Sequence, residues 1–477
     1  MGAVIAELSA QLGTTAVLLG DAIPQRNRQD CANLPPARPL ALLCPRSTEE
    51  VAAILRICHR HGQPVAVQGG MTGLAGGAHP SGDEIALSLE RMVGVEEVDM
   101  AAATLTVLAG TPLSLVQDAA SAAGLICGVD LGARGSCTIG GIIATNAGGN
   151  QVLRYGATRR NLLGLEAVLA DGTVISHLNT MMKDNTGYDW PQLLAGSEGT
   201  LGIVTRAVIA LHPAPARIAT MMLALDGFDD ALALLRRVQA ALPGRLLAFE
   251  AMGRDFVSAA AAIGIAAPFP DPAEVVLLLE ADIGSGCEGE TLLQDVVATA
   301  IEEGEVRDAV PAQSQAQAQR FWALREATAQ YRSHGYRVRG LDISIPLASM
   351  AQAIALLGRA STERLPGLQV FWFGHVADSN IHVCGLLTDP DDPRGGVLDE
   401  IVYGCVARFG GSISAEHGIG RIKRNRLSLS RSEAELALMR HLKDALDPRG
   451  ILNPGRIFPE ASARQRRTAE SAAGTKA

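Results

Sequence analysis

The chain has 477 residues, enough for roughly two or three domains that each bury their own core. A hydrophobic content of 48% with 19% charged residues is typical of an ordered globular protein, and a net charge of −9 argues against a general nucleic-acid binder. The 8 cysteines include no CxxC pair and indicate buried thiols in a reducing compartment. With no run of about 18 apolar residues and no basic, apolar leader, we expect a cytoplasmic protein without a transmembrane segment.

Helix and strand patterns alternate between residues 38 and 215. Residues 46–62 predict a helix, because Ser47 and Glu50 form a capping-box pattern at its start and Gly62 suits its end. The other elements predicted here are strands at 63–70, 104–110, 161–175 and 199–211 and a helix at 111–124. The prolines of residues 212–217 indicate a domain boundary.

A second α+β pattern follows, from residue 216 to residue 424. Its predicted strands lie at 218–228, 274–282 and 337–346, and its predicted helices at 229–242, 290–304 and 313–335. A further helix is predicted at 432–447, within a C-terminal segment of residues 425–458. The composition of residues 461–477 predicts a disordered tail.

Three stretches concentrate the glycines: residues 68–77, 130–150 and 195–203. Glycine lets backbone amides approach a phosphate closely, and successive N–H groups form a nest for an anion. None of the stretches carries the GxGxxG pattern of a dinucleotide-binding fold or the GK[ST] end of a Walker A loop. Ordinary tight turns would explain any one stretch. An extended diphosphate ligand threaded through several loops would explain all three together.

The segment FGHVADSNIHV, residues 373–383, places His375 and His382 seven residues apart around a polar centre. Both flanks read as strands, and a turn at Asp378-Ser379 would make the two histidines directly opposite partners. Cross-strand side chains on one face lie about 5 Å apart, so both imidazoles could reach one metal ion. The alternative is two half-exposed histidines on a hairpin that binds nothing.

The segment SAEHGIG, residues 414–420, supplies Glu416 and His417. Two histidines and one carboxylate suit Zn²⁺ with an open coordination position for a substrate. The same donors match the facial triad of a non-haem Fe(II) enzyme. Taken alone, Glu416 could equally be a solvated loop acid and His417 a buried structural histidine.

Seven motifs occur in one order: PVAVQGGMTGLAGG, DLGARGSCTIGGIIATNAGG, LRYGATRRNLLGLEAVLADGT, KDNTGYDWPQLLAGSEGTLGI, GHVADSNIHV, SAEHGIG and LDPRGILNPGRIF. Through them the chain resembles flavoproteins of the vanillyl-alcohol oxidase/p-cresol methylhydroxylase (PCMH) superfamily, in the D-lactate and D-2-hydroxyglutarate dehydrogenase branch. The resemblance covers about residues 38–458. It implies an α+β fold, with a PCMH-type FAD-binding domain at 38–215 and an α+β substrate (cap) domain at 216–424 that carries the metal hairpin. The short C-terminal helical segment, 425–458, would return to the FAD domain.

The resemblance implies that FAD lies along the three glycine-rich stretches, with its pyrophosphate on the loop of residues 68–73. The implied FAD-binding residues are Gln68, Gly69, Gly70, Met71, Thr72, Gly73, Asp130, Gly135, Ser136, Ile139, Gly140, Gly141, Ala144, Thr145, Asn146, Gly148, Gly149, Tyr155, Glu198, Gly199, Gly202, Ile203, Val204 and Asn453. Covalent relatives use a histidine or cysteine, commonly in the pyrophosphate loop. That loop has neither here, and His79 is the nearest candidate, so we expect non-covalent FAD. The chain departs from the family's usual residues at Met71, in place of Asn, and at Ser379, in place of Gly.

For the chemistry, the resemblance implies that His375, His382 and Glu416 bind Zn²⁺ or another divalent metal, with Asn380 close by. A metal bound to the substrate's hydroxyl and carboxylate lowers the hydroxyl pKa. The implied catalytic base, His417, would take the hydroxyl proton while C2 gives a hydride to flavin N5.

The implied substrate-binding residues are Arg325, Thr328, Arg339 and Asn380. Arg325 matches a carboxylate-binding position of the family, and Thr328 stands one residue before the family's threonine. Relatives that favour 2-hydroxyglutarate carry a lysine two residues before the equivalent of Asp342, where this chain has Gly340. Arg339 is therefore the candidate second cation for a dicarboxylate, although consecutive strand residues point to opposite faces.

The sequence thus predicts an FAD- and divalent-metal-dependent dehydrogenase that oxidises a D-2-hydroxy acid and uses an acceptor other than NAD. D-2-hydroxyglutarate is favoured over D-lactate and glycolate. The alternatives are a non-catalytic flavoprotein subunit, which the intact His-His-Glu-His set argues against, and a non-haem iron oxygenase, in which the flavin-type loops would have no purpose. An electron-transfer flavoprotein, a cytochrome or a quinone would take the electrons, and a homodimer is compatible with the sequence.

Overall fold

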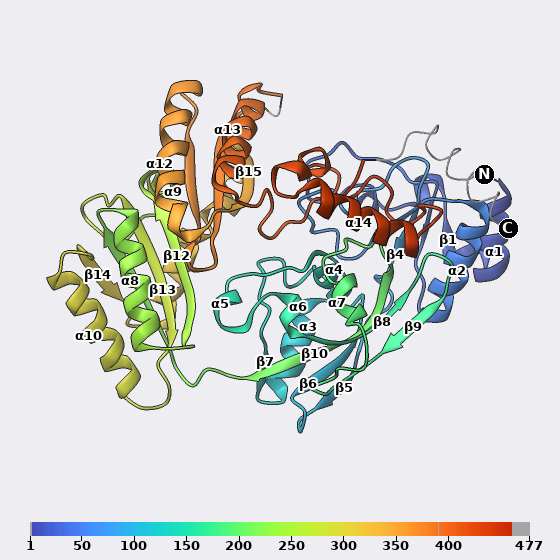
Figure 1. Ribbon diagram of the computed structural model, residues 1–477, viewed down its shortest axis with the longest axis horizontal. Coiled ribbons are helices and arrows are strands. Elements are labelled where there is room, and N and C mark those ends of the chain that lie inside the picture. Colours follow the sequence, from blue (N-terminus) through green and yellow to red (C-terminus); the bar gives the residue numbers. More distant parts are fainter. Residues whose placement is uncertain (1, 390, 460–477) are drawn as a thin grey trace.

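The computed structural model describes residues 2–389 and 391–459 and shows two halves side by side (Figure 1). The first half ends with strand β10 (Ile203–Pro213), and the second begins with β11 (Ile218–Leu225). Helix α14 (Glu433–Leu446), near the C-terminus, lies back over the first half. The chain therefore leaves the first half once and returns to it. The predicted tail at 461–477 lies outside the described residues.

The first half contains two sheets. One has the order β1-β2-β4-β3, with β2, β4 and β3 in parallel, and the other has the antiparallel order β5-β6-β10-β8-β9, with β7 paired to β10. The strands are β1 Val17–Leu18, β2 Ala41–Leu43, β3 Val65–Gln68, β4 Ile85–Ser88, β5 Val95–Asp99, β6 Thr104–Leu108, β7 Leu125–Cys127, β8 Leu162–Val168 and β9 Val174–His177. The helices are α1 Gly2–Leu12, α2 Thr48–His61, α3 Leu113–Ala122, α4 Ile139–Thr145, α5 Val152–Tyr155, α6 Thr158–Asn161 and α7 Trp190–Leu194.

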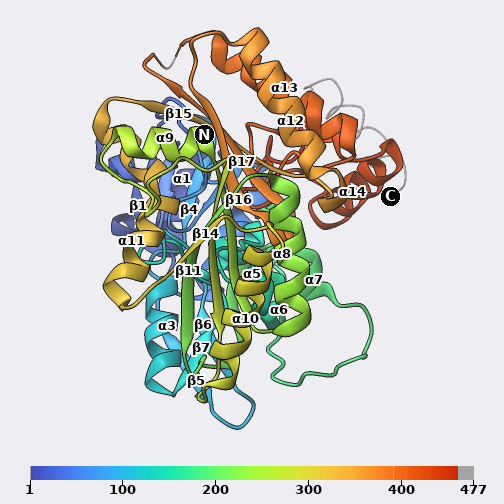
Figure 2. The ribbon, with the colours of Figure 1, turned by 90° about the vertical axis from the view of Figure 1, so that its left-hand side faces the viewer.

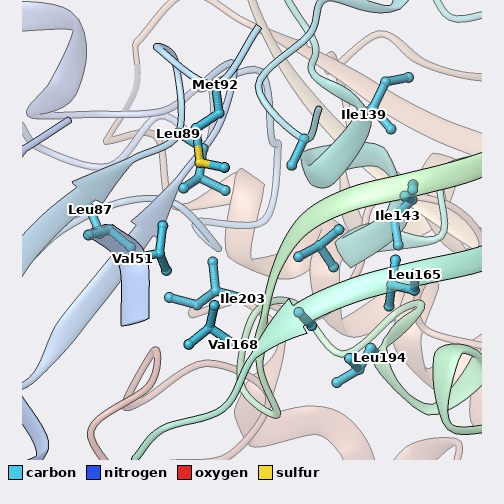
Figure 3. Packing of buried hydrophobic residues seen from close by; sticks show 14 of the residues in the cluster. Val51, Leu87, Leu89, Met92, Ile139, Ile143, Leu165, Val168, Leu194 and Ile203 are labelled. Atoms are coloured by element: carbon cyan, nitrogen blue, oxygen red, sulfur yellow. The ribbon is translucent and has the colours of Figure 1, made fainter. Parts of the chain in front are cut away.

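Apolar side chains from both sheets and from the helices beside them share one core, part of which Figure 3 shows. Val51 of α2, Leu87 of β4, Ile143 of α4 and Ile203 of β10 are each at most 1% exposed. Burying one such side chain stabilises the fold by about 1.5–3 kcal/mol relative to leaving it in water. This core fixes the ends of β3, α4 and β10, which carry the glycine-rich stretches.

The helix predicted at residues 46–62 forms as α2. Ser47 Oγ accepts a bond from Glu50 N at 3.3 Å, and Gly62 ends the helix with a left-handed φ of 61°. The N-terminal residues, which no predicted domain included, are also folded: α1 packs on α2 and buries Val4 and Leu8, and β1 pairs with β2. The ordered fold thus begins well before residue 38.

The second half is built on one antiparallel sheet of order β14-β11-β13-β12-β16-β17-β15. Helices α8, α10, α12 and α13 cover one face, and α9 and α11 cover the other (Figure 2). The strands are β12 Leu246–Gly253, β13 Val275–Asp282, β14 Asp308–Pro311, β15 Arg337–Ser344, β16 Val370–His375 and β17 Asn380–Leu387. The helices are α8 Phe228–Ala241, α9 Arg254–Ala262, α10 Glu288–Glu302, α11 Gln315–Arg325, α12 Leu347–Arg364 and α13 Arg394–Phe409.

Several elements of this half differ from those predicted from the sequence. The single helix predicted over residues 313–335 is wrong, because α11 ends at Arg325 and a 3₁₀ helix, η4 (Ala327–His334), follows. The tighter winding lets Ala327 and Tyr331 enter the core beneath the sheet, where both are completely buried. Strand β12, in the middle of the sheet, was not predicted at all.

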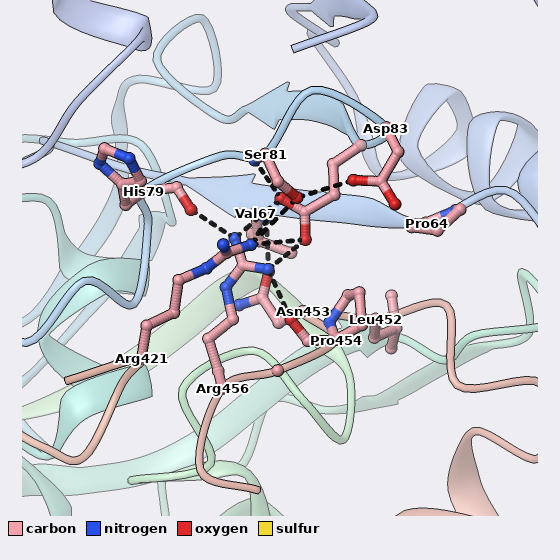
Figure 4. Close-up of polar contacts among 12 residues, drawn as sticks. Pro64, Val67, His79, Ser81, Asp83, Arg421, Leu452, Asn453, Pro454 and Arg456 are labelled. Atoms are coloured by element: carbon pink, nitrogen blue, oxygen red, sulfur yellow. Dashed lines mark hydrogen bonds and ion pairs between the residues drawn. The ribbon is translucent and has the colours of Figure 1, made fainter. Parts of the chain in front are cut away.

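The C-terminal segment is held to the first half by buried polar contacts. Lys443 of α14 donates to the carbonyl of Thr200 in the first half at 2.8 Å and to that of Leu452 in its own segment at 2.9 Å. Arg421 and Arg456 converge on the Glu84 carboxylate, which is 1% exposed (Figure 4). Burial makes such charge-assisted bonds strong, so this segment is a fixed part of the fold. None of the helices formed by residues 2–389 and 391–459 is long and apolar enough to span a bilayer.

Candidate active site

The three glycine-rich stretches, far apart in sequence, come together around one cavity with a volume of about 350 Å³. Its lining consists of residues 67–75, 77–78, 131–133, 137–138, 140–142, 144–145, 147–148, 194, 197–199 and 202–204, with Leu89 and Asn453. Glu416 and His417 complete the wall. The cleft predicted to bind a cofactor therefore opens directly onto the residues predicted to carry the chemistry.

Most of the residues predicted to bind FAD line this cleft. They are Gln68, Gly69, Gly70, Met71, Thr72, Gly73, Gly140, Gly141, Ala144, Thr145, Gly148, Glu198, Gly199, Gly202, Ile203, Val204 and Asn453. The structure does not place the others in its wall: Asp130, Gly135, Ser136, Ile139, Asn146, Gly149 and Tyr155. Ile139 belongs to the apolar core, Asn146 accepts a bond from Arg159 N at 2.9 Å, and the Tyr155 ring packs 4.8 Å from that of His212.

Thr138 is a cleft residue that the sequence analysis missed. Its hydroxyl is buried and has no hydrogen-bond partner within the protein. A Cβ at Gly69 would lie 2.5 Å from Thr138 Oγ1, so this wall tolerates no side chain at that position. An unpaired hydroxyl beside bare backbone fits a polar ligand such as the diphosphate of FAD.

Glu198 lines the cleft, and its carboxylate is bonded to the loop that follows His417. Its carboxylate accepts bonds from the backbone N–H groups of Ile419 and Gly420, both at 2.7 Å. Asn453 joins this contact, donating to Glu198 O and accepting from Val67 N at 2.8 Å. Glu198 therefore ties the loop that carries Glu416 and His417 to the cofactor cleft.

The two departures from the family's usual residues both fall on left-handed backbone, with φ of 59° at Met71 and 72° at Ser379. Asn and Gly adopt this region more easily than other residues. We expect Met71→Asn and Ser379→Gly each to raise the free energy of unfolding by about 0.5–1 kcal/mol, measured by denaturant titration. Met182→Asn, at a 94% exposed residue outside the left-handed set, should leave it unchanged. Equal effects at residues 71 and 182 would contradict the strain argument.

The histidine hairpin forms, but its register differs from the prediction. His382 is paired with Phe373, not with His375, because a turn of 3₁₀ helix, η5 (Val376–Asp378), shifts the reversal by one residue. Phe373 and His375 share a face, so the two imidazoles still lie on one side of the sheet. Their ring centroids are 5.8 Å apart.

Glu416 meets these two histidines. Ligand atoms of His375, His382 and Glu416 all lie within 4.8 Å of one another, and His375 Nε2 is 3.8 Å from Glu416 Oε1. Burial lowers the pKa of His382 well below its ordinary value, so its ring is neutral and can bind a cation. Two imidazoles and a carboxylate fit Zn²⁺ or another divalent metal, as the sequence predicted.

Glu250 of β12 is the main residue that the sequence analysis missed. It is the direct cross-strand partner of His375, and its Oε1 lies 2.6 Å from His375 Nδ1. Burial alone would raise the pKa of Glu250, but the charges of His375 and Arg325 lower it to about 2. In return, although burial opposes it, Glu250 raises the pKa of His375 to about 9. A histidine binds a metal through a neutral imidazole nitrogen, so metal affinity should fall as the pH drops.

Arg325 reaches the same place from the end of α11. It donates from Nε to Glu250 Oε2 at 2.7 Å, and its Nη2 lies 3.3 Å from His375 Nε2. The guanidinium carbon sits 4.6 Å from the Phe373 ring centroid. The structure thus brings Arg325 beside the candidate metal ligands.

Asp342 of β15 organises the loop that carries Glu416 and His417. Its Oδ2 accepts backbone N–H bonds from Ala415 at 3.1 Å and from Glu416 and His417 at 3.0 Å. Burial alone would raise the pKa of Asp342, but His417 and Lys423 hold it well below its ordinary value. The ionised carboxylate therefore lies next to the loop of Glu416 and His417, 3.7 Å from His417 Nδ1.

Asn380 shares this anchor. It donates from Nδ2 to Asp342 Oδ1 at 2.7 Å, while its own Oδ1 is buried without a partner. An unpaired buried amide oxygen close to the candidate metal ligands could accept a hydrogen bond from a ligand hydroxyl or from a metal-bound group.

Arg339, a predicted substrate residue, is not brought to this cluster, and Thr328 lies beyond the helix that carries Arg325. Arg339 lies on the face of β15 opposite to Asp342 and is paired with Asp399 of α13, with Nε to Oδ1 at 2.9 Å. Thr328 belongs to the 3₁₀ helix η4 and not to α11, so its direction does not follow from Arg325 by helical rotation. On the Asp342 face the neighbouring residue is Gly340, where an added Cβ would meet only Cys384 Sγ at 3.5 Å and Val338 at 4.0 Å.

Residues 214–457 match the family described as FAD linked oxidases, C-terminal domain, and residues 39–177 match the family described as FAD binding domain. The chain belongs to the FAD-linked oxidases. The family membership, the flavoenzyme class and the α+β fold with a PCMH-type FAD-binding domain predicted from the sequence are confirmed.

Among the relatives of this FAD-linked oxidase are proteins named D-2-hydroxyglutarate dehydrogenase. The one from Xanthomonas citri pv. viticola is 39% identical over 88% of this chain and 89% of its own length. The mitochondrial one from Bos taurus is 39% identical over 88% and 76%, respectively.

Solved structures share the fold at low identity. p-Cresol methylhydroxylase with substrate bound matches with a TM-score of 0.75 and 16% identity, over 96% of this chain and 97% of that one. Alkyldihydroxyacetonephosphate synthase matches with a TM-score of 0.72 and 16% identity, over 95% and 84%.

Proposed function

We propose that this FAD-linked oxidase oxidises a D-2-hydroxy acid to the 2-oxo acid, with a divalent metal held by His375, His382 and Glu416. The observation that carries the proposal is that Glu416 and His417 line the cofactor cleft while Glu416 also meets the two histidines. One residue pair thereby links the flavin site to the metal site. The names of the relatives from Xanthomonas citri pv. viticola and Bos taurus supply the substrate class.

In this proposal the chain's own residues bind and orient the substrate. Arg325 holds the carboxylate, because its guanidinium is already placed beside His375. His417 takes the hydroxyl proton, since its imidazole lies between the cofactor cleft and the Asp342 carboxylate. When bound, the metal would lower the hydroxyl pKa and FAD would accept the hydride from C2. Asn380 accepts a hydrogen bond from the substrate hydroxyl through its unpaired Oδ1.

We propose that FAD is bound without a covalent link. His79 is 4% exposed and does not line the cleft. Cys137 does line it, but burial raises the pKa of its thiol to about 11, so the nucleophilic thiolate is scarce at neutral pH. Acid precipitation should leave the flavin in the supernatant, and yellow colour retained in the pellet would reject this.

Within the D-2-hydroxy acids we favour D-2-hydroxyglutarate, on the names of the relatives; D-lactate and glycolate are the alternatives. Arg339 does not support a distal carboxylate contact, because it faces Asp399. We therefore expect Arg339→Ala to change turnover of D-2-hydroxyglutarate and D-lactate by the same factor. Selective loss of D-2-hydroxyglutarate turnover would show instead that Arg339 contacts the distal carboxylate of the substrate.

The decisive experiment is anaerobic reduction of the bound flavin by both enantiomers of lactate, malate, 2-hydroxyglutarate and mandelate, together with glycolate. We expect bleaching by D-enantiomers only, fastest with D-2-hydroxyglutarate. Bleaching by none of these acids would favour a non-catalytic flavoprotein subunit. Purified protein without a flavin spectrum would contradict the whole proposal.

The acceptor is proposed to be an electron-transfer flavoprotein, a cytochrome or a quinone, and a homodimer stays a prediction. The cytoplasmic location expected from the sequence also stays a prediction, since the relative from Bos taurus is named mitochondrial.

A further inference from the structure

Glu250 contacts both the candidate metal ligand His375 and Arg325, the candidate binding residue for the substrate carboxylate. It is 1% exposed, and both of its carboxylate oxygens are engaged, Oε1 with His375 Nδ1 and Oε2 with Arg325 Nε. We propose that Glu250 is a positioning residue that aims His375 at the metal, aims Arg325 at the substrate carboxylate and neutralises the guanidinium beside the metal. This inference rests on the proposed function.

The strand register makes this arrangement rigid. Glu250 of β12 is paired directly with His375 of β16, so the backbone ladder fixes the distance between the carboxylate and the imidazole. With Nδ1 facing Glu250, the imidazole presents Nε2 to Glu416 at 3.8 Å. A carboxylate behind a metal-binding histidine fixes the ring orientation, and losing such a partner typically lowers metal affinity about 10–100-fold.

The second reason is electrostatic. Arg325 Nη2 lies 3.3 Å from His375 Nε2, the same nitrogen that would bind the metal. A guanidinium and a divalent ion this close repel each other strongly in a buried site unless an anion lies between them or beside them. Glu250 is that anion, because it bonds to the guanidinium itself. Its charge therefore allows the two cations to share one site.

The chain offers a matched control in Glu280, on the neighbouring strand β13. Glu280 is partly buried on the same face of the sheet, where it accepts bonds from Trp322 Nε1 at 2.8 Å and Thr220 Oγ1 at 2.7 Å. It bonds to neither His375 nor Arg325. Neutralising Glu280 thus removes a partly buried acid from the same face while leaving the bonds of Glu250 to His375 and Arg325 intact.

The test compares wild type, Glu250→Gln, Glu250→Asp and Glu280→Gln as FAD-loaded full-length proteins. Zn²⁺ affinity is measured by competition with a chromophoric chelator. Binding of 2-oxoglutarate and of pyruvate to the oxidised enzyme is followed through the flavin absorbance. For Glu250→Gln we expect Zn²⁺ affinity to fall about 10–100-fold and the affinity for both 2-oxo acids to fall about tenfold or more. Glu280→Gln should match wild type within about twofold.

Wild-type affinities in Glu250→Gln would overturn the proposal, as would equal losses in Glu280→Gln. If Glu250→Gln does not fold with FAD, Glu250→Asp decides: its shorter side chain cannot span both partners, so one of the two affinities should fall about tenfold. Unchanged affinities in Glu250→Asp would then overturn the proposal. A wild type that binds no Zn²⁺ would reject the metal part of the proposed function, and the 2-oxo acid measurements would still decide the role of Glu250.

Discussion

His417→Ala should slow reduction of the flavin by a D-2-hydroxy acid by about 10²–10⁴-fold, the usual contribution of a general base. The imidazole lines the cofactor cleft, and its ring is stacked on that of His382 with centroids 6.0 Å apart. His417 thus lies where the cofactor cleft meets the proposed metal ligands, and we expect the substrate hydroxyl to bind there. Single-turnover reduction under anaerobic conditions measures this step without the electron acceptor.

The same variant should keep its FAD and its metal. His417 is not among the three proposed ligands, and its backbone N–H, which holds the loop to Asp342, is untouched by the substitution. His441→Ala, at an exposed position of α14, provides the control and should reduce at the wild-type rate. Reduction of His417→Ala within a few-fold of wild type would remove His417 as the base.

Short-range patterns predicted much of this site because its motifs are local in sequence. The backbone character of each glycine-rich stretch could be read from its composition. The faces of the hairpin were also predictable, since strand periodicity keeps His375 and His382 on one side even though the register shifted by two residues. The shift itself depends on η5, a turn whose length the sequence did not indicate.

Glu250 could not be found in this way. Its strand is buried along its whole length, so it lacks the alternation that marks a half-exposed strand. Its partner His375 lies 125 residues away, and only the sheet order places β12 beside β16. A charged residue within an apolar run is the one available signal, because a buried carboxylate needs compensating partners.

For Arg339, in contrast to Glu250, the sequence did predict the direction of the side chain. Strand periodicity alone indicated that residue 339 and Asp342 face different sides, and the structure pairs Arg339 with Asp399 on the far face. The partner, on α13, could not be named from the sequence. Strand periodicity thus predicts which face of the sheet a side chain occupies, whereas its contacts on that face depend on tertiary packing.

Asp342→Asn should destabilise the protein by about 3–5 kcal/mol and slow flavin reduction by about 100-fold or more. The carboxylate is fully buried and receives only donors: Asn380 Nδ2 on Oδ1, and three consecutive backbone N–H groups on Oδ2. An asparagine amide has one NH₂ group, which would face a donor in either orientation. The asparagine amide is also neutral, so it cannot replace the negative charge that lies 3.7 Å from the Lys423 ammonium.

The loss of stability should depend on pH in a defined direction. The pKa of Asp342 is held well below its ordinary value in the folded protein, so its contribution is complete above about pH 4, where an unfolded aspartate is ionised. As the pH falls further, the unfolded state takes up the proton first, and the contribution shrinks. Denaturant titrations should therefore show the largest gap between wild type and Asp342→Asn at neutral pH and a smaller gap in acid.

Asp399→Asn separates this effect from the loss of any acid near β15. Asp399 pairs with Arg339 and Arg426, whose side chains are 41% and 37% exposed, so solvent screens much of the interaction. We expect it to cost roughly 1 kcal/mol or less and to leave flavin reduction at the wild-type rate. If Asp342→Asn cost no more than Asp399→Asn, the Asp342 carboxylate would not be what holds the loop of Glu416 and His417, and the backbone alone would position these two residues.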